Sequence, residues 1–105
     1  MINIVHVDIH LDDERNITAV EMKLKSLEDN KPELSGHPLI ATVSAAFYKT
    51  TLLTDFGKSL TTELNPNRSN IINLTVSLKE NTMTYEDVGK FVDYFQKALD
   101  ETKLF

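Results

Sequence analysis

The sequence predicts an α+β fold: a two-layer sandwich of about four mostly antiparallel strands with two helices on one face. Three observations lead to this prediction: segments in which apolar and polar residues alternate, an apolar stripe of helical period near the C-terminal end, and a length of 105 residues. We expect residues 1–105 to form one domain. The predicted order is β-β-β-α-β-α, and the alternative β-α-β-α-β-α applies if residues 17–28 are helical.

The two clearest strands are residues 4–11 and 70–79. From Val5 to Leu11 and from Ile72 to Lys79, every second residue is apolar and the residues between are polar. Such alternation buries one face of a strand and leaves the other in water, as is typical of antiparallel sheets. The apolar sets are Val5, Val7, Ile9 and Leu11 in the first strand and Ile72, Leu74, Val76 and Leu78 in the second.

Residues 17–27 fit two structures. Their composition favours a helix, because Ala, Glu, Met, Leu and Lys all have high helix propensity. Residues 20–25 nevertheless alternate without a fault, and a helix would place Met22 on its wet face. We therefore favour a strand, with residues 12–16 as the hairpin loop before it.

Residues 39–48 also alternate, but neither of their two sets contains a charged residue. This pattern indicates a central strand. Residues 51–64 are predicted to be helical, since Leu52, Phe56, Leu60 and Leu64 are spaced by four. The dipeptide Asn65-Pro66 would end that helix.

The most secure element is a helix that begins after Thr84. Thr84 is a good N-cap, and Glu86 and Asp87 follow in the first turn, where negative charge suits the helix dipole. The apolar stripe of this helix consists of Val88, Phe91, Val92, Phe95 and Leu99.

Composition and charge exclude several classes of function. The chain has no cysteine, which removes disulfides, thiolate metal sites and a thiol nucleophile. With a net charge of −5 and scattered basic residues, a nucleic acid is disfavoured as a partner. No apolar run approaches the ~20 residues that span a bilayer, and the N-terminal residues do not resemble a signal peptide. We expect a soluble cytoplasmic protein with neither a membrane partner nor a cofactor.

The sharpest group of chemically active side chains is His6, Asp8 and His10. On a strand all three point to one face, and neighbours two apart lie ~6.5–7 Å apart along the strand, within reach of a shared metal. His6 and His10 are too far apart to bind the same ion. A metal site would therefore use Asp8, one histidine and a ligand from elsewhere, such as His37 or Asp12. The alternative is that these residues are the polar face of an amphipathic strand.

The uncharged face of residues 39–48 is the second candidate. Without the charges that keep open sheets apart, this face suits a partner. The candidate partner-binding residues are Ile40, Thr42, Ser44, Tyr48, Tyr94 and Phe105. The predicted function is a small non-catalytic binding or assembly module, which acts as a homo-oligomer, with a homodimer foremost, or with another protein. The alternative is a small metal- or acid–base-dependent enzyme that uses the His6, Asp8 and His10 face.

Overall fold

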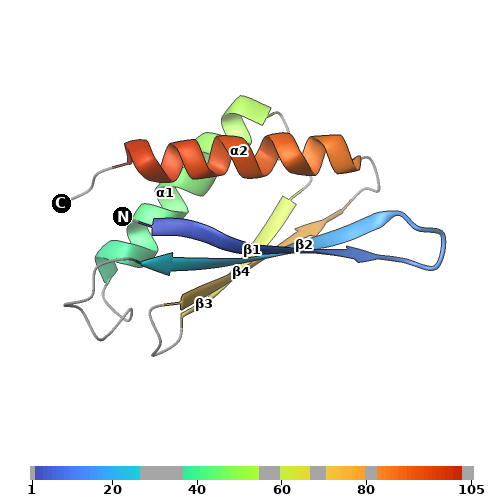
Figure 1. The fold of residues 1–105 in the computed structure, drawn as a ribbon, viewed down its shortest axis with the longest axis horizontal. Helices are drawn as coiled ribbons and strands as arrows, with labels where there is room; N and C mark the ends of the chain where they lie inside the picture. The colour runs from blue at the N-terminus through green and yellow to red at the C-terminus, as the bar shows by residue number, and fades with distance from the viewer. Residues whose placement is uncertain (1, 27–36, 55–59, 67–70, 80–82, 103–105) are drawn as a thin grey trace.

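The computed structural model describes residues 2–26, 37–54, 60–66, 71–79 and 83–102, and it contains one antiparallel sheet with two helices on one face (Figure 1). The strands lie in the order β1-β2-β4-β3. The predicted fold class, a two-layer α+β sandwich of four antiparallel strands with two helices on one face, is therefore confirmed. The elements are β1 (Ile2–Leu11), β2 (Ile17–Ser26), α1 (His37–Thr54), β3 (Leu60–Pro66), β4 (Ile71–Leu78) and α2 (Tyr85–Glu101).

The order of the two middle elements was predicted wrongly. Residues 39–48 lie in helix α1 and not in a central strand, while the segment predicted as the helix 51–64 contains the end of α1 and strand β3. The observed order is β-β-α-β-β-α. Residues 17–26 form a strand, as the faultless alternation of residues 20–25 indicated.

The composition of α1 explains why its sequence is also compatible with a strand. An uncharged segment has no polar face, so a period of two and a period of 3.6 both fit it. Three of its buried residues, Val43, Ala46 and Thr50, follow each other at helical spacings of three and four. The hydroxyl of Thr50 donates a hydrogen bond to the carbonyl of Ala46 at 2.8 Å, which pairs this buried polar group inside the helix.

Strand β3 is the edge strand opposite β1. It pairs with β4 in a register that sets Leu64 opposite Leu74 and Glu63 opposite Thr75. Pro66 ends the strand, which is a position that an edge strand tolerates. The spacing of four that suggested a helix joins residues from different elements, because Leu52 lies in α1 and Leu64 in β3, while Phe56 is outside the described residues.

Strand β1 is interrupted by a bulge that the alternation did not reveal. Its register against β2 shifts between Ile4 and His6, so Ile4 faces Leu24 and His6 faces Lys23. The extra residue, Val5, is 53% exposed, although its place in the alternation predicted burial. A bulge adds one residue to one strand of a pair and thereby reverses the sides of the residues beyond it. Ile2 and Ile4 can therefore face the core together with Val7 and Ile9.

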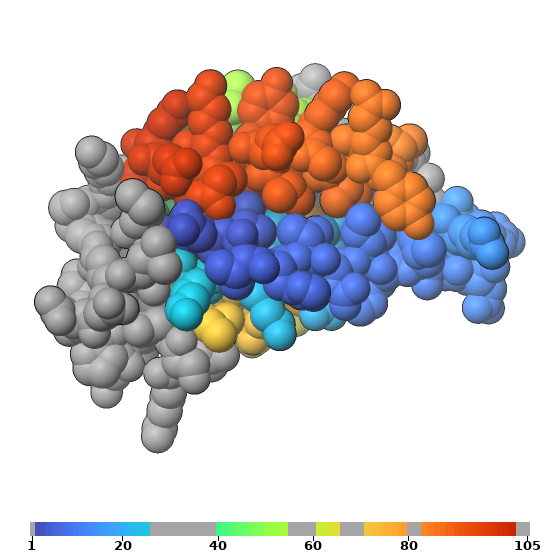
Figure 2. Space-filling model, in the orientation of Figure 1, coloured from blue at the N-terminus to red at the C-terminus, as the bar shows by residue number. Residues whose placement is uncertain are grey.

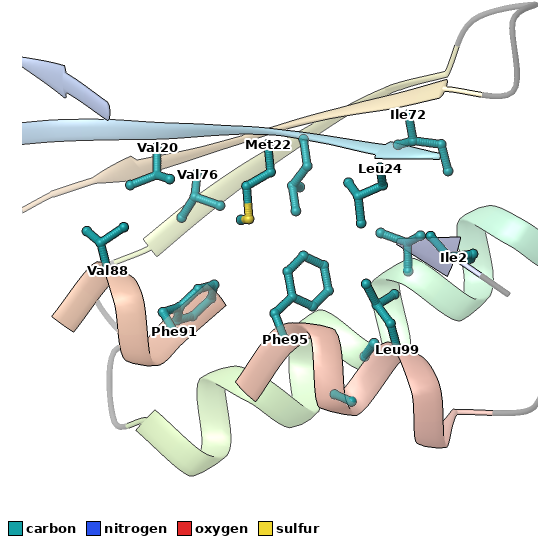
Figure 3. Close-up of a cluster of buried hydrophobic side chains, with 14 of the residues drawn as sticks. Ile2, Val20, Met22, Leu24, Ile72, Val76, Val88, Phe91, Phe95 and Leu99 are labelled. Carbon is teal, nitrogen blue, oxygen red and sulfur yellow. The ribbon is translucent and has the colours of Figure 1, made fainter. Parts of the chain in front are cut away.

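The hydrophobic core lies between the sheet and the helices (Figure 3). The close-up shows side chains of β2 and β4 that point toward Val88, Phe91, Phe95 and Leu99 of α2. Phe47 of α1 completes a small aromatic cluster, with ring centroids 5.6 Å from Phe91 and 5.9 Å from Phe95 in edge-on arrangements. This cluster joins the two helices.

Helix α2 also contacts the outer edge of β1 through a side-chain amide. Gln96 accepts a hydrogen bond from the backbone N–H of Ile4 at 2.8 Å and donates one to the carbonyl of Ile2 at 3.1 Å. On the outer side of an edge strand, backbone N–H and carbonyl groups have no neighbouring strand with which to pair. Figure 2 shows α2 resting along β1 on this side of the molecule. One amide thus takes the place of a neighbouring strand at the start of the sheet.

The start of α2 has the cap that the sequence predicted. Thr84 Oγ1 accepts a hydrogen bond from the N–H of Asp87 at 3.1 Å, and Asp87 Oδ2 accepts one from the N–H of Thr84 at 2.9 Å. This reciprocal pair is a capping box. Hydrogen bonds from the Thr84 backbone and side chain lower the pKa of Asp87 below its ordinary value of 3.8.

We expect Thr84→Ala to lower the free energy of unfolding by about 1 kcal/mol, because the first turn of α2 loses a hydrogen-bond acceptor for an otherwise unpaired N–H. Urea unfolding at pH 7 measures this loss. Asp87 should add a dependence on pH. Since its folded pKa lies below its unfolded pKa, its contribution is present above about pH 4 and is lost as the pH falls through the folded value.

The variant Asp87→Asn should therefore lose less stability than the unmodified chain between pH 4 and pH 2. Asp93→Asn is the matched control, because Asp93 is an exposed aspartate in the middle of the same helix. If both variants show the same acid dependence as the unmodified chain, the capping box does not hold the charge of Asp87.

The hairpin loop lies at residues 12–16, as predicted. Asp12 organises it, since its Oδ1 accepts hydrogen bonds from the N–H groups of Glu14 at 2.9 Å and Asn16 at 2.8 Å. Arg15 has a φ of 65°, a left-handed conformation that is uncommon for a residue with a long side chain.

Within the described residues, no helix has the length and apolar character needed to cross a membrane.

Candidate functional site

The three polar residues of β1 that the sequence singled out lie on the face of the sheet that no described helix covers. His6, Asp8 and His10 are all exposed. Across β2 they face Lys23, Glu21 and Ala19 respectively. The prediction that these three side chains share one face agrees with this register, since they all follow the bulge at Val5.

The closest contact on this open face joins His10 to Glu21. The distance between His10 Nε2 and Glu21 Oε1 is 2.7 Å, and the two side chains are 44% and 51% exposed. Glu21 is not directly opposite His10 but one diagonal step along β2. The hydroxyl of Thr18 donates a hydrogen bond to the backbone carbonyl of His10 at 3.3 Å.

Sequence reasoning missed Glu21 because the register of the hairpin is irregular. Leu11 pairs with Ile17, and a regular hairpin would continue with His10 opposite Thr18 and Asp8 opposite Val20. The structure has a shift between His10 and Leu11, so Asp8 faces Glu21 instead. The only signal in the sequence was that Glu21 belongs to the wet set of the alternating segment 20–25. That signal could place Glu21 on the open face but not beside His10.

The metal ligands predicted from the sequence are not gathered into a cluster. Among the described residues, the structure brings together no group of three or more His, Cys, Asp or Glu side chains that could hold a metal ion. The carboxylate of Asp12 accepts hydrogen bonds from backbone N–H groups within the hairpin loop. The side chain of His37 lies outside the described part of the chain. A metal at His6, Asp8 or His10 stays a prediction that lacks a third ligand here.

The predicted partner-binding residues need a correction, because four of them lie on a helix and not on a strand. In α1, Ser44 and Tyr48 are exposed, Ile40 is half-buried and Thr42 is buried. On a strand these four would have shared one face, whereas the helical turn moves Thr42 to the core side. Tyr94 of α2 is 44% exposed. Phe105 lies outside the described residues.

A small apolar pocket lies under the first turns of α2. Its volume is about 10 Å³, and it is lined by Val20, Val76, Met83, Val88 and Phe91. A space of this size holds at most one water molecule, and a water would find no polar partner in this lining. The pocket is therefore a gap in core packing and not a place for a substrate.

Comparison with known proteins gives one structural likeness. No family model and no curated protein matches the chain. A search of solved structures found the ribosomal processing protease Prp from S. aureus, in complex with a covalently linked product peptide. The two share 18% sequence identity over 90% of this chain and 88% of that chain, with a TM-score of 0.37. At these values the likeness carries no activity over to this chain.

The predicted function does not agree with the name of this solved chain. A non-catalytic binding or assembly module was expected, but the similar solved chain is an enzyme. The alternative, an enzyme that uses His6, Asp8 and His10, is not tested by this comparison and stays a prediction; among the described residues His10 pairs with Glu21. The comparison does not test the predicted partners, which stay a prediction.

Proposed function

We propose that this chain is an acid–base enzyme whose catalytic residue is His10 and whose positioning residue is Glu21. The 2.7 Å contact between His10 Nε2 and Glu21 Oε1 is the observation that carries the proposal. A carboxylate that accepts a hydrogen bond from the N–H of one ring nitrogen leaves the lone pair of the other ring nitrogen free. In this arrangement His10 Nδ1 is the general base.

The surroundings of the pair set the class of substrate. His10 and Glu21 lie on an open strand face, so an extended chain can be laid across the strands without entering a cavity. Lys23 is the next residue of β2 on this face, and it supplies a positive charge for a polar substrate group. We propose an ester or amide in such a chain as the substrate.

The proposed reaction uses water as the nucleophile. His10 Nδ1 takes a proton from water while the water oxygen attacks the carbonyl carbon. The protonated imidazole then gives the proton to the leaving oxygen or nitrogen as the bond to the carbonyl carbon breaks. Glu21 holds the ring in place and stabilises the imidazolium that forms between the two steps.

Hydrolysis of p-nitrophenyl acetate tests this proposal, because the reaction reports general-base or nucleophilic imidazole without a known substrate. General-base catalysis contributes roughly 10²–10⁴-fold at a closed site. At this open pair we expect His10→Asn to lower the protein-dependent rate about tenfold. His6→Asn is the matched control, since His6 is an exposed histidine on the same strand and face.

The variant Glu21→Gln tests whether Glu21 positions the imidazole of His10 or only adds negative charge to the surface. It should lower the rate and shift the pH profile of hydrolysis, and Glu21→Asp should restore part of the loss. Imidazole ¹⁵N chemical shifts should show the proton on Nε2 in the unmodified chain and a mixture of tautomers in Glu21→Gln. Equal losses from His6→Asn and His10→Asn would mean that the chain shows only the reactivity of free histidine.

A further inference from the structure

Helix α1 is apolar on the side that faces away from the core. Its inner side is formed by buried residues that include Val43, Ala46 and Thr50. On its outer side Tyr48 is 65% exposed and Leu52 is 63% exposed. The outward side of a surface helix is normally polar or charged. We call this side the outer stripe, and it consists of Ala41, Ser44, Ala45, Tyr48 and Leu52.

The two helices of the layer differ in charge. Within α1, Lys49 is the only lysine, arginine, aspartate or glutamate, and its Nζ is 3.0 Å from Glu101 Oε2 of α2. That hydrogen bond holds the pKa of the Glu101 carboxyl below its ordinary value. The exposed side of α2 alternates acids and bases, which are Glu86, Lys90, Asp93, Lys97 and Asp100. The outer stripe of α1 is therefore an uncharged surface on a chain of net charge −5.

The absence of charge on the outer stripe limits the kinds of partner that this surface suits. Two copies of this chain repel each other over most approaches, because each carries an excess of acid. On the outer stripe, contact between two copies buries no charge of either sign. A strongly basic or acidic partner would gain nothing from this stripe.

The outer stripe also matches itself under two-fold symmetry. In an antiparallel pair of α1 helices, an axis that passes between Ala45 and Tyr48 sets Ala45 against Tyr48 of the second copy. One turn further out, the same axis sets Ala41 against Leu52 of the second copy, because both pairs have the same midpoint in the sequence. These two pairings each place a small side chain against a large one, and each pairing occurs twice, as an isologous interface requires.

We propose that a second copy of this chain docks on the outer stripe of α1 in an antiparallel two-fold arrangement. The helix of 18 residues is about 27 Å long. Stable dimers bury about 800 Å² on each partner. A single helix face supplies less than this area, so the dimer should form at micromolar to millimolar concentration. The proposal is independent of the chemistry at His10.

Sedimentation equilibrium over a range of concentrations is the first test. The unmodified chain should move from monomer to dimer, and Tyr48→Asp should weaken association at least about tenfold because it places a negative charge in each of two symmetric contacts. Tyr85→Asp is the matched control, since Tyr85 is 60% exposed at the start of α2, outside the stripe. Circular dichroism confirms that both variants are folded. A chain that stays monomeric at millimolar concentration would overturn the proposal.

Cross-linking locates the interface. Because the chain has no cysteine, a single introduced thiol reacts without background. A short bismaleimide should join two copies of Ala45→Cys, because residue 45 of each copy lies close to the two-fold axis, on opposite sides of it. It should not join Ser77→Cys, which lies exposed on β4 in the sheet. Dimers that cross-link at Ser77 and not at Ala45 would show that the copies meet through another face.

Discussion

Replacement of Phe95 by alanine is expected to lower the free energy of unfolding by about 3–5 kcal/mol, which is much of the stability of a domain of this size. The Phe95 side chain is fully buried in α2 and lies close to the rings of Phe47 and Phe91. Its loss opens a cavity between the sheet and both helices, and it removes one of the two ring contacts that join α1 to α2. Urea unfolding followed by circular dichroism measures the change.

Tyr94→Ala is the matched control, because Tyr94 precedes Phe95 in the same helix and its side chain is 44% exposed. We expect this variant to cost less than 1 kcal/mol, in the range typical of surface positions. Similar losses for the two variants would mean that the buried stripe of α2 is not at the position described.

Replacement of Gln96 by leucine is expected to destabilise the chain by about 1–3 kcal/mol, although the new side chain is apolar and similar in size. The loss arises at β1, where the N–H of Ile4 and the carbonyl of Ile2 would lose their partner. Hydrogen exchange gives the most specific measurement. The amide of Ile4 should lose its protection in the variant, while amides of β2 and β4 should change much less.

Lys97→Leu places the same side chain at an exposed position one residue further along α2, and it should leave the Ile4 amide protected. If the Ile4 amide is protected equally in both variants, another group covers the edge of β1. The same comparison can follow aggregation, since an uncovered edge strand is a site for pairing between chains.

The fold class and several elements could be predicted because the pattern along the sequence agrees with burial in the structure. Val20, Met22 and Leu24 alternate with charged residues, and they are buried on one face of β2. The stripe of Val88, Phe91, Phe95 and Leu99 is buried in α2, and Thr84 caps that helix as expected. In these segments the hydrophobic period and the local signals indicate the same structure.

The remaining elements could not be predicted because their period is ambiguous. In residues 39–48 of α1, apolar or neutral side chains lie on every side, whether the segment is read as a strand or as a helix. Only packing against the sheet and α2 decides which side is buried. In β3, Leu60 and Leu64 follow the α1 residue Leu52 at multiples of four residues by coincidence. Single-residue bulges had a similar effect at the site, where a shift beside His10 decides that Glu21 is its neighbour.

The hydrogen bond between Ile4 and Gln96 joins residues that are 92 positions apart. A ribosome adds residues in order, so β1 and β2 can pair as a hairpin long before Gln96 has been made. Until then Ile2 and Ile4 lack the partner that Gln96 provides at the outer edge of β1. We therefore expect this edge to be most open to other strands during synthesis, after the hairpin has formed and before α2 exists. Ribosome-bound chains stopped before residue 96 should be the form that most readily acquires a foreign strand.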